Sequence, residues 1–330
     1  SSARTKAFLP DGNGNFVSAG ELLLEKARTN FVETSEPIPI GQPINGTSSL
    51  FVNDITTPDG RVSTVRKVTF GSAANSLYRF GDTTSGSVDT SYAGSIWMRS
   101  VSGTVTVELD VNDGGNTTFN LTETWERFET THNRPGNNTF RFFDITGSND
   151  SIYIWGAQLE EGSYATSYIP TFGATATRAA DVSSSSSNTL GNSFYKQSEG
   201  TVFSEVKTLS STPNNYSNIF ELQKADNTDR LFVRYPNYAG WEASGQTNLY
   251  LNKSFAQESK VALGFKTNDA LLAVNGNAGG GDTSVTIGET KNELCIGYSG
   301  DTFGFLNGTI KRLTLWPERL PNATLQTITT

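Results

Sequence analysis

Apolar and polar residues alternate along most of the chain in short runs, and turns rich in Gly, Asn and Asp separate these runs. Alternation with a period of two, with many β-branched and aromatic residues, is typical of β-strands. Only residues 19–30 and 320–329 have the spacing typical of a helix. The pattern predicts an all-β fold of antiparallel strands. The clearest runs are 95–101, 104–111, 117–131, 139–145 and 151–159, and then 200–209, 217–226, 229–237, 259–268, 269–278, 282–288, 292–298 and 307–316.

A serine-rich segment separates the two groups of runs. Residues 178–193, RAADVSSSSSNTLGNS, contain five consecutive serines and few large side chains, so they cannot bury enough apolar surface to fold alone. We therefore predict two antiparallel β-sandwich (jelly-roll) domains in tandem, residues 1–182 and 199–330, joined by a Ser-rich linker at 183–198. The first domain ends in a strap, because Pro170 and irregularly spaced aromatic residues stop the strand pattern after Glu160.

The charge and the hydropathy of the chain argue against two classes of partner, nucleic acids and membranes. The chain has 25 Lys and Arg against 33 Asp and Glu, a net charge of −8, which argues against nucleic acid as a partner. No run of about 18 apolar residues is present, so no membrane insertion is expected. A single cysteine, Cys295, cannot form an internal disulfide, and its apolar neighbours predict a buried position.

Two segments of the first half have idiosyncratic sequences. Residues 152–182, IYIWGAQLEEGSYATSYIPTFGATATRAADV, and residues 22–32, LLLEKARTNFV, are similar to segments of phage tail-fibre and head-fibre proteins around a carbohydrate-binding-module-like jelly roll. This resemblance covers residues 1–182. It implies a protein on the virion surface, on the capsid or tail, that contacts other virion proteins and forms a homo-oligomer, since virus fibres are often trimeric. No heptad run specifies three strands here.

The second half resembles another family. Residues 303–329, FGFLNGTIKRLTLWPERLPNATLQTIT, are similar to the last strand and tail of concanavalin-like lectin and laminin-G-like sandwiches. The resemblance covers residues 200–330 and implies a lectin-like β-sandwich for the second domain.

One tryptophan differs from the other four. Trp97, Trp125, Trp155 and Trp316 fall in or beside strand runs, which predicts core positions, whereas Trp241 lies in a segment of Pro, Asn, Gly and Ser. Sugars stack on aromatic rings and pair with amides and charged groups, so this segment is the candidate glycan site. The alternatives are a hairpin tip folded onto the sheet and an oligomer contact. The candidate residues are Trp241, Tyr238, Tyr235, Arg234, Asn237 and Glu242.

A weaker pattern, at residues 110–113, indicates a candidate metal site. Asp110, Asn112 and Asp113 offer the oxygen ligands that Ca²⁺ prefers, and a structural Ca²⁺ is the one cofactor that the sequence suggests. Ordinary turn chemistry explains the same residues and is the favoured interpretation.

The sequence argues against catalysis. The Glu-x-Asp-x-x-Glu strand of sandwich glucanases is missing, and the single histidine, His132, has no serine elbow beside it. We therefore expect a non-catalytic virion surface protein that binds host or environmental polysaccharide. The alternatives are a structural decoration protein of capsid or tail without glycan binding, and a polysaccharide depolymerase.

Overall fold

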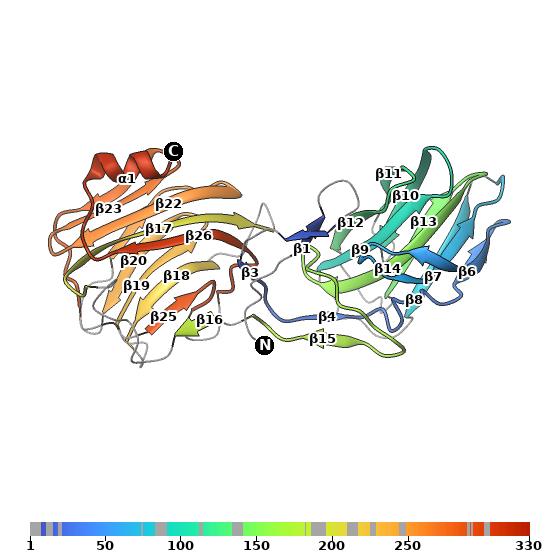
Figure 1. The fold of residues 1–330 in the computed structure, drawn as a ribbon, viewed down its shortest axis with the longest axis horizontal. Coiled ribbons are helices and arrows are strands. Elements are labelled where there is room, and N and C mark those ends of the chain that lie inside the picture. Colours follow the sequence, from blue (N-terminus) through green and yellow to red (C-terminus); the bar gives the residue numbers. More distant parts are fainter. Residues whose placement is uncertain are drawn as a thin grey trace. The chain divides into compact units, whose positions relative to one another are not determined.

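In the computed structural model, the regular secondary structure of the described residues is antiparallel strands and one short helix, which confirms the predicted all-β fold class (Figure 1). The chain forms two compact units. Unit 1 contains the described residues of Ala19–Lys26 and Ala180–Thr330, and unit 2 contains those of Phe8–Ser18 and Ala27–Ala179. The structure describes residues 8–10, 16–18, 22–73, 75–82, 91–111, 115–133, 141–181, 183–185, 196–209, 217–224, 229–243, 249–288, 291, 293–299 and 304–330.

Unit 2 is a sandwich of two five-stranded sheets whose apolar side chains meet in one core. Ile96 and Ile152 from one sheet and Val107 and Phe143 from the other are almost completely buried there. Short two-stranded pairs, β1 (Phe8–Pro10) with β2 (Phe16–Ser18) and β4 (Arg28–Asn30) with β15 (Ala176–Arg178), complete the unit. The sheets have the orders β11 (Thr117–Leu121), β10 (Val105–Val111), β13 (Arg141–Gly147), β8 (Ser76–Asp82), β5 (Gln42–Ile44), and β12 (Glu126–Asn133), β9 (Ser91–Ser100), β14 (Ser151–Glu161), β7 (Val62–Thr69), β6 (Ser48–Thr56).

Unit 1 is a sandwich of two six-stranded sheets. The alternating apolar residues of the facing strands form its core, as the period of two requires. The sheets have the orders β16 (Ser183–Ser185), β25 (Glu293–Ile296), β18 (Ser217–Gln223), β19 (Asp229–Tyr235), β20 (Tyr238–Ala243), β21 (Leu249–Asn252), and β24 (Asn277–Asp282), β23 (Asp269–Val274), β22 (Glu258–Lys266), β17 (Glu199–Thr208), β26 (Gly308–Trp316), β3 (Leu22–Leu24).

The two segments with helical spacing have different outcomes. Residues 322–328 form helix α1 (Asn322–Ile328), whose buried Leu325 packs on Phe203 and Ala262 at the outer face of the second sheet (Figure 1). The prediction of a helix at 19–30 is wrong, because this segment contains strands β3 and β4. Pairing of β3 with β26 buries Leu24, and this tertiary gain outweighs the local helical preference. Among the described residues, no helix has the length and apolarity needed to cross a bilayer.

The predicted domain boundary differs from the observed division at two places. Residues 22–26 lie between the two segments of unit 2 in the sequence and yet belong to unit 1, because β3 pairs with β26. The linker prediction is wrong for Ser183–Ser185, which pair with Leu294–Ile296 as an edge strand. Ladder hydrogen bonds use backbone groups that every serine has, so an edge strand needs little apolar side-chain surface. Residues 186–195 of the predicted linker lie outside the described residues.

Candidate functional site

Strands β19 and β20 form a hairpin, and their alternation divides the predicted glycan-binding residues between two faces of one sheet. Tyr235 and Trp241 point into the core of unit 1, where they are 4% and 5% exposed. The Trp241 ring meets the edge of Phe265 from the opposite sheet, with ring centroids 6.3 Å apart. The prediction that Trp241 and Tyr235 form an accessible sugar platform is therefore wrong. Residues 229–243 are a regular hairpin, and both residues occupy its inward positions.

The outward positions of the same strands form a compact aromatic cluster. Phe232, Tyr238 and Tyr250 lie with ring centroids 5.7 to 6.4 Å apart, and the rings of Tyr238 and Tyr250 are nearly perpendicular. Phe232 is completely buried, Tyr238 is half-buried and Tyr250 is 44% exposed. Gly240 lies opposite both Phe232 and Tyr250 in the ladders, so no side chain occupies the centre of the cluster. The outer face therefore presents two tyrosine rings on a buried phenylalanine.

A carboxylate is held beside the exposed ring. The Tyr250 hydroxyl donates to Glu242 Oε1 at 3.1 Å, and Arg230 Nη2 donates to Glu242 Oε2 at 2.6 Å. The Glu242 side chain is 19% exposed. We call Tyr238, Tyr250 and Glu242 the tyrosine patch.

A buried polar network supports the tyrosine patch from within the sheet. Arg234 stacks on Phe232 with its guanidinium carbon 3.7 Å from the ring centroid, and it donates to Glu221 at 3.0 Å and to Asn218 at 2.6 Å. The Arg234 and Glu221 side chains are only 5% and 0% exposed. Because both side chains are buried, each holds the other in position. Loss of one partner would leave the other charge buried and uncompensated. Arg234 thus has a supporting role and does not lie at the surface as predicted.

Sequence reasoning missed Phe232 and Tyr250, and it named Asn237 as a candidate glycan contact. Asn237 lies in the two-residue turn between β19 and β20 and is exposed. The signal for the hairpin was present, because the apolar residues Leu231, Val233 and Tyr235 recur at every second position up to a Pro-Asn turn. Extending that alternation through the turn would have turned Trp241 inward and Tyr238 outward.

The predicted metal residues belong to unit 2. Asp110 is a buried residue of β10, with 8% of its surface exposed, and Asn112 and Asp113 lie outside the described residues. Within the part of the chain that the structure describes, no three His, Cys, Asp or Glu side chains come together as a metal site. The Ca²⁺ site stays a prediction.

The other tryptophans behave largely as predicted. Trp97, Trp125 and Trp155 are at most 8% exposed and cluster on the outer face of the β12–β9–β14–β7–β6 sheet. Gly156 has φ +64° at a bulge in β14, and a Cβ there would come within 2.9 Å of Trp97. Trp316 in β26 is only half-buried.

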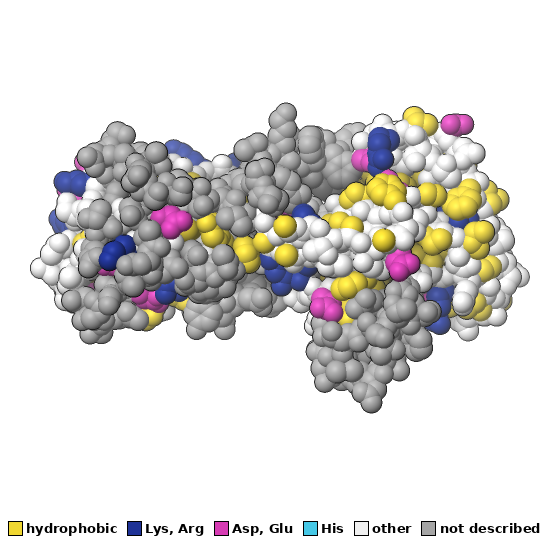
Figure 2. Space-filling view, turned by 90° about the horizontal axis from the view of Figure 1, so that it is seen from below, with side chains coloured by type: hydrophobic (Ala, Val, Ile, Leu, Met, Phe, Trp, Pro, Cys, Tyr) yellow, Lys and Arg dark blue, Asp and Glu magenta, His cyan; other side chains and the backbone are white. Residues whose placement is uncertain are grey.

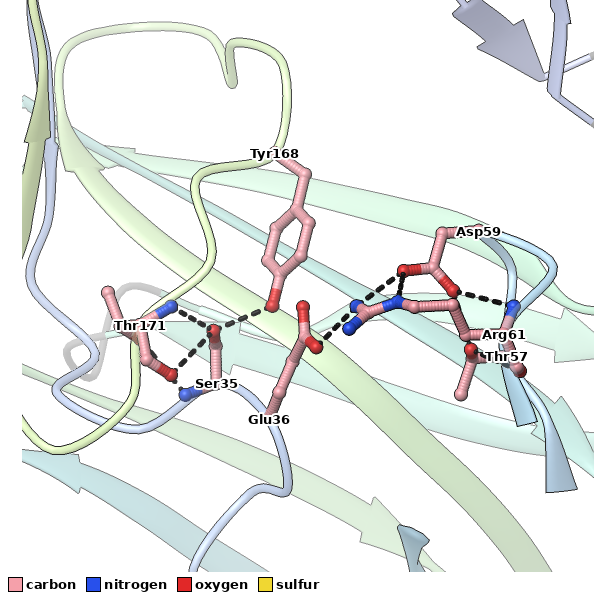
Figure 3. Close-up of polar contacts among 7 residues, drawn as sticks. All are labelled: Ser35, Glu36, Thr57, Asp59, Arg61, Tyr168 and Thr171. Atoms are coloured by element: carbon pink, nitrogen blue, oxygen red, sulfur yellow. Dashed lines mark hydrogen bonds and ion pairs between the residues drawn. The ribbon is translucent and has the colours of Figure 1, made fainter. Parts of the chain in front are cut away.

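The strap that follows β14 covers part of this tryptophan cluster. Tyr168 packs on Trp155 with ring centroids 5.1 Å apart, and its hydroxyl lies 2.6 Å from Ser35 Oγ (Figure 3). Ser35 Oγ also accepts from the Thr171 backbone N–H at 2.9 Å. Burial raises the pKa of Tyr168 far above its ordinary value, so this hydroxyl stays protonated and able to donate. These contacts hold the strap against the sheet.

An ion-pair chain lies beside the strap. Arg61 bridges Glu36, at 2.6 Å, and Asp59, at 2.5 Å (Figure 3). Burial alone would raise the pKa of Asp59, but hydrogen bonds from Arg61 and Thr57 outweigh it and lower this pKa below the usual value near 3.8. The ion-pair chain links residue 36 to the turn at residues 57–61 of unit 2.

Comparisons with known proteins add only distant likenesses. No protein-family model matches the chain, and no curated protein matches it in sequence. Among solved structures, a SAP-like pentraxin from Limulus polyphemus is 17% identical, with 40% of this chain and 70% of that chain covered and a TM-score of 0.32. Domains LG4-5 of the mouse laminin α1 chain are 13% identical, with 75% and 90% covered and a TM-score of 0.30. The CBM22-1–CBM22-2 tandem domain of Paenibacillus barcinonensis Xyn10C is 8% identical, with 91% and 99% covered and a TM-score of 0.32. At such TM-scores these likenesses carry no argument about function, and the fold assignment rests on the strands themselves.

Proposed function

We propose that this chain is a non-catalytic glycan-binding protein of a bacteriophage surface, and that the tyrosine patch contacts the sugar. The observation that carries the proposal is the exposed Tyr250 ring, held beside Glu242 on a rigid sheet face. Aromatic rings bind the CH faces of sugars, and a fixed carboxylate accepts hydrogen bonds from sugar hydroxyls. The patch needs no rearrangement, because the buried Arg234 network already fixes it.

The viral part of the proposal rests on the resemblance of residues 152–182 to phage fibre proteins. We propose on this basis that the protein lies on the capsid or tail surface, with other virion proteins and further copies of the chain as partners. The glycan part rests on the tyrosine patch and is independent of that resemblance.

The geometry of the patch favours binding over hydrolysis. Glu242 accepts a hydrogen bond from Arg230, and Glu221 accepts one from Arg234. A glycoside hydrolase needs two carboxyl groups that both reach the scissile bond, whereas the Glu221 side chain is completely buried. Glu242 is therefore the one carboxylate of this pair that a sugar can reach.

The test is an array of bacterial surface polysaccharides probed with the wild type, Tyr250→Ala and the control Phe172→Ala. Phe172 is 69% exposed in unit 2 and lies outside the patch. The proposal expects specific binding that Tyr250→Ala loses and Phe172→Ala keeps. Equal binding by both variants would show that the tyrosine patch is not the glycan-binding site. Release of reducing ends from a polysaccharide would establish a depolymerase instead.

A second candidate function is structural decoration of the virion, and one observation favours it. Figure 2 shows hydrophobic side chains gathered on one face of unit 2 among uncharged polar ones. Among the described residues, the exposed large hydrophobic side chains of this unit are Ile40, Leu50, Phe51, Val62 and Phe172. Such side chains are typical of protein contacts. A wild-type protein that binds virion proteins and no glycan on the array would support this candidate.

A further inference from the structure

Three side chains from three neighbouring strands of unit 2 form a row on the outer face of the sheet. Tyr153 in β14 lies directly opposite Lys67 in β7 and directly opposite Arg99 in β9. Tyr153 alternates with the fully buried Ile152 and Ile154, so its ring points away from the core. All three side chains are partly exposed. We call Lys67, Tyr153 and Arg99 the basic row.

The Arg99 guanidinium is fixed by aromatic rings. Its central carbon lies 4.6 Å from the ring centroid of Tyr153 and 5.3 Å from that of Trp125. Trp125 is itself anchored, because its indole N–H donates to the Thr56 carbonyl at 2.9 Å. Stacking between rings holds the position of a guanidinium while leaving N–H donors at its edges. Arg99 is thus oriented before any ligand arrives.

Neither cation of the basic row has a carboxylate partner among the described residues. Arg99 donates only a long hydrogen bond, 3.3 Å, to the Glu123 backbone carbonyl, while the Glu123 carboxylate accepts from the Gly103 N–H. Lys67 makes no ion pair within the described part of the chain. Three other arginines of unit 2 have carboxylate partners: Arg61 pairs with Glu36 and Asp59, Arg79 with Asp144, and Arg127 with Glu129. The buried Arg66 instead donates to the Ile38 carbonyl.

This contrast has a physical consequence. In a chain with a net charge of −8, two cations that flank one residue and pair with no carboxylate of the described residues form a local positive site. The Tyr153 ring lies between them, one strand spacing of about 4.8 Å from each strand. A ligand that offers both an apolar ring face and a carboxylate would satisfy all three side chains together. The Arg99 Nε atom is buried, so its two terminal nitrogens are the donors that face a carboxylate ligand.

We propose that the basic row is a second saccharide site, specific for acidic sugars, in which a uronic acid residue stacks on Tyr153 and its carboxylate pairs with Arg99 or Lys67. The site is independent of the tyrosine patch, since the two lie in different units. The neighbouring part of the sheet is closed, because the strap residue Tyr168 covers Trp155. The ligand therefore lies along the row and does not extend over the tryptophan cluster.

The test is calorimetric titration of the full chain with oligogalacturonate and alginate oligosaccharides, and with their carboxyl-reduced neutral forms. We expect the acidic forms to bind and the neutral forms to bind at least about tenfold more weakly, as loss of a charge-assisted hydrogen bond implies. Arg99→Gln and Lys67→Gln should each weaken binding of the acidic forms, and Arg99→Lys should retain part of it. Lys207→Gln removes the same charge from an exposed position in unit 1 and serves as the control.

The outcomes separate this proposal from the proposed function. Tyr250→Ala should leave uronate binding unchanged, and Arg99→Gln should leave the glycan selected on the array unchanged. Wild-type protein that binds neither acidic probe, or that loses as much affinity in Lys207→Gln as in Arg99→Gln, would overturn the site. Equal affinity for single-stranded DNA would assign the row to phosphate polyanions and overturn its specificity for sugar acids. If Arg99→Gln fails to fold, the affinity of Lys67→Gln for the acidic oligosaccharides decides the test.

Discussion

The Tyr250 hydroxyl and the Glu242 carboxylate are joined by a 3.1 Å hydrogen bond across the β20–β21 pair. This contact orients the Tyr250 ring, the most exposed aromatic ring among the described residues of unit 1, next to a fixed acceptor. Tyr250→Phe keeps the ring and loses the contact, whereas Tyr250→Ala loses both. We expect Tyr250→Ala to weaken binding of the array-selected glycan at least about tenfold and Tyr250→Phe to have a smaller effect.

Stability measurements make this prediction specific. Truncation of the partly exposed Tyr250 side chain should lower the free energy of unfolding by less than about 1 kcal/mol. Denaturant titration of both Tyr250 variants checks this. A loss of several kcal/mol would show that reduced binding comes from a damaged fold and not from a lost contact.

Trp241 should behave as a core residue. Its ring is 5% exposed and packs against Phe265, so Trp241→Ala should lower the unfolding free energy of unit 1 by about 3–5 kcal/mol. Trp241→Phe fills most of the space and should cost less. Chemical denaturation followed by circular dichroism measures both. A Trp241→Ala protein with wild-type stability would contradict the buried position.

Strand β3 should be required for the stability of unit 1 although it lies near the beginning of the sequence. Leu24 is 1% exposed and fills the space above Gly297, where a Cβ would come within 2.2 Å of Leu24 Cδ1. Leu24→Ala should therefore destabilise unit 1 by about 2–5 kcal/mol. Differential scanning calorimetry of the full chain measures the effect, with the exposed Leu50 truncated to Ala as control.

The same strand allows a test by complementation. A fragment of residues 180–330 lacks β3, so it should be less stable than unit 1 in the full chain, and a synthetic peptide of residues 19–26 should raise its melting temperature. A fragment that is as stable alone as unit 1 is in the full chain would show that β3 contributes nothing.

Asp59 should make the stability of unit 2 depend on pH in the acidic range. Its folded pKa is lower than its usual value near 3.8, so its contribution is complete above that value and disappears as the pH falls through the folded pKa. Because the side chain is 31% exposed, solvent screening limits this contribution to roughly 0.5–1 kcal/mol. Asp59→Asn should therefore be less stable than wild type at pH 7 and equal to it well below pH 3.8.

Thermal unfolding at a series of pH values checks this prediction, with Glu318→Gln as a control that removes one negative charge from an exposed position in unit 1. A stability difference between Asp59→Asn and wild type that stays constant down to pH 2 would contradict the assigned coupling to Arg61.

The sequence by itself determined the all-β class, most strands and helix α1, because each depends on a local pattern that the chain displays directly. Residues 322–328 show the clearest case, since helical spacing and a buried Leu325 agree. The same local pattern predicted core positions for Trp97, Trp125 and Trp155, which the structure confirms.

Only the tertiary structure decided which residues meet. Local spacing suggested a helix at 19–30, yet Leu24 completes a sheet whose partner residue, Gly308, lies far along the chain. Trp241 looked like a loop residue until the β19–β20 register turned it inward. The basic row also joins strands that are distant in sequence, with Lys67 and Arg99 on either side of Tyr153. Register between distant strands depends on the packing of two whole faces, and no short segment contains that information.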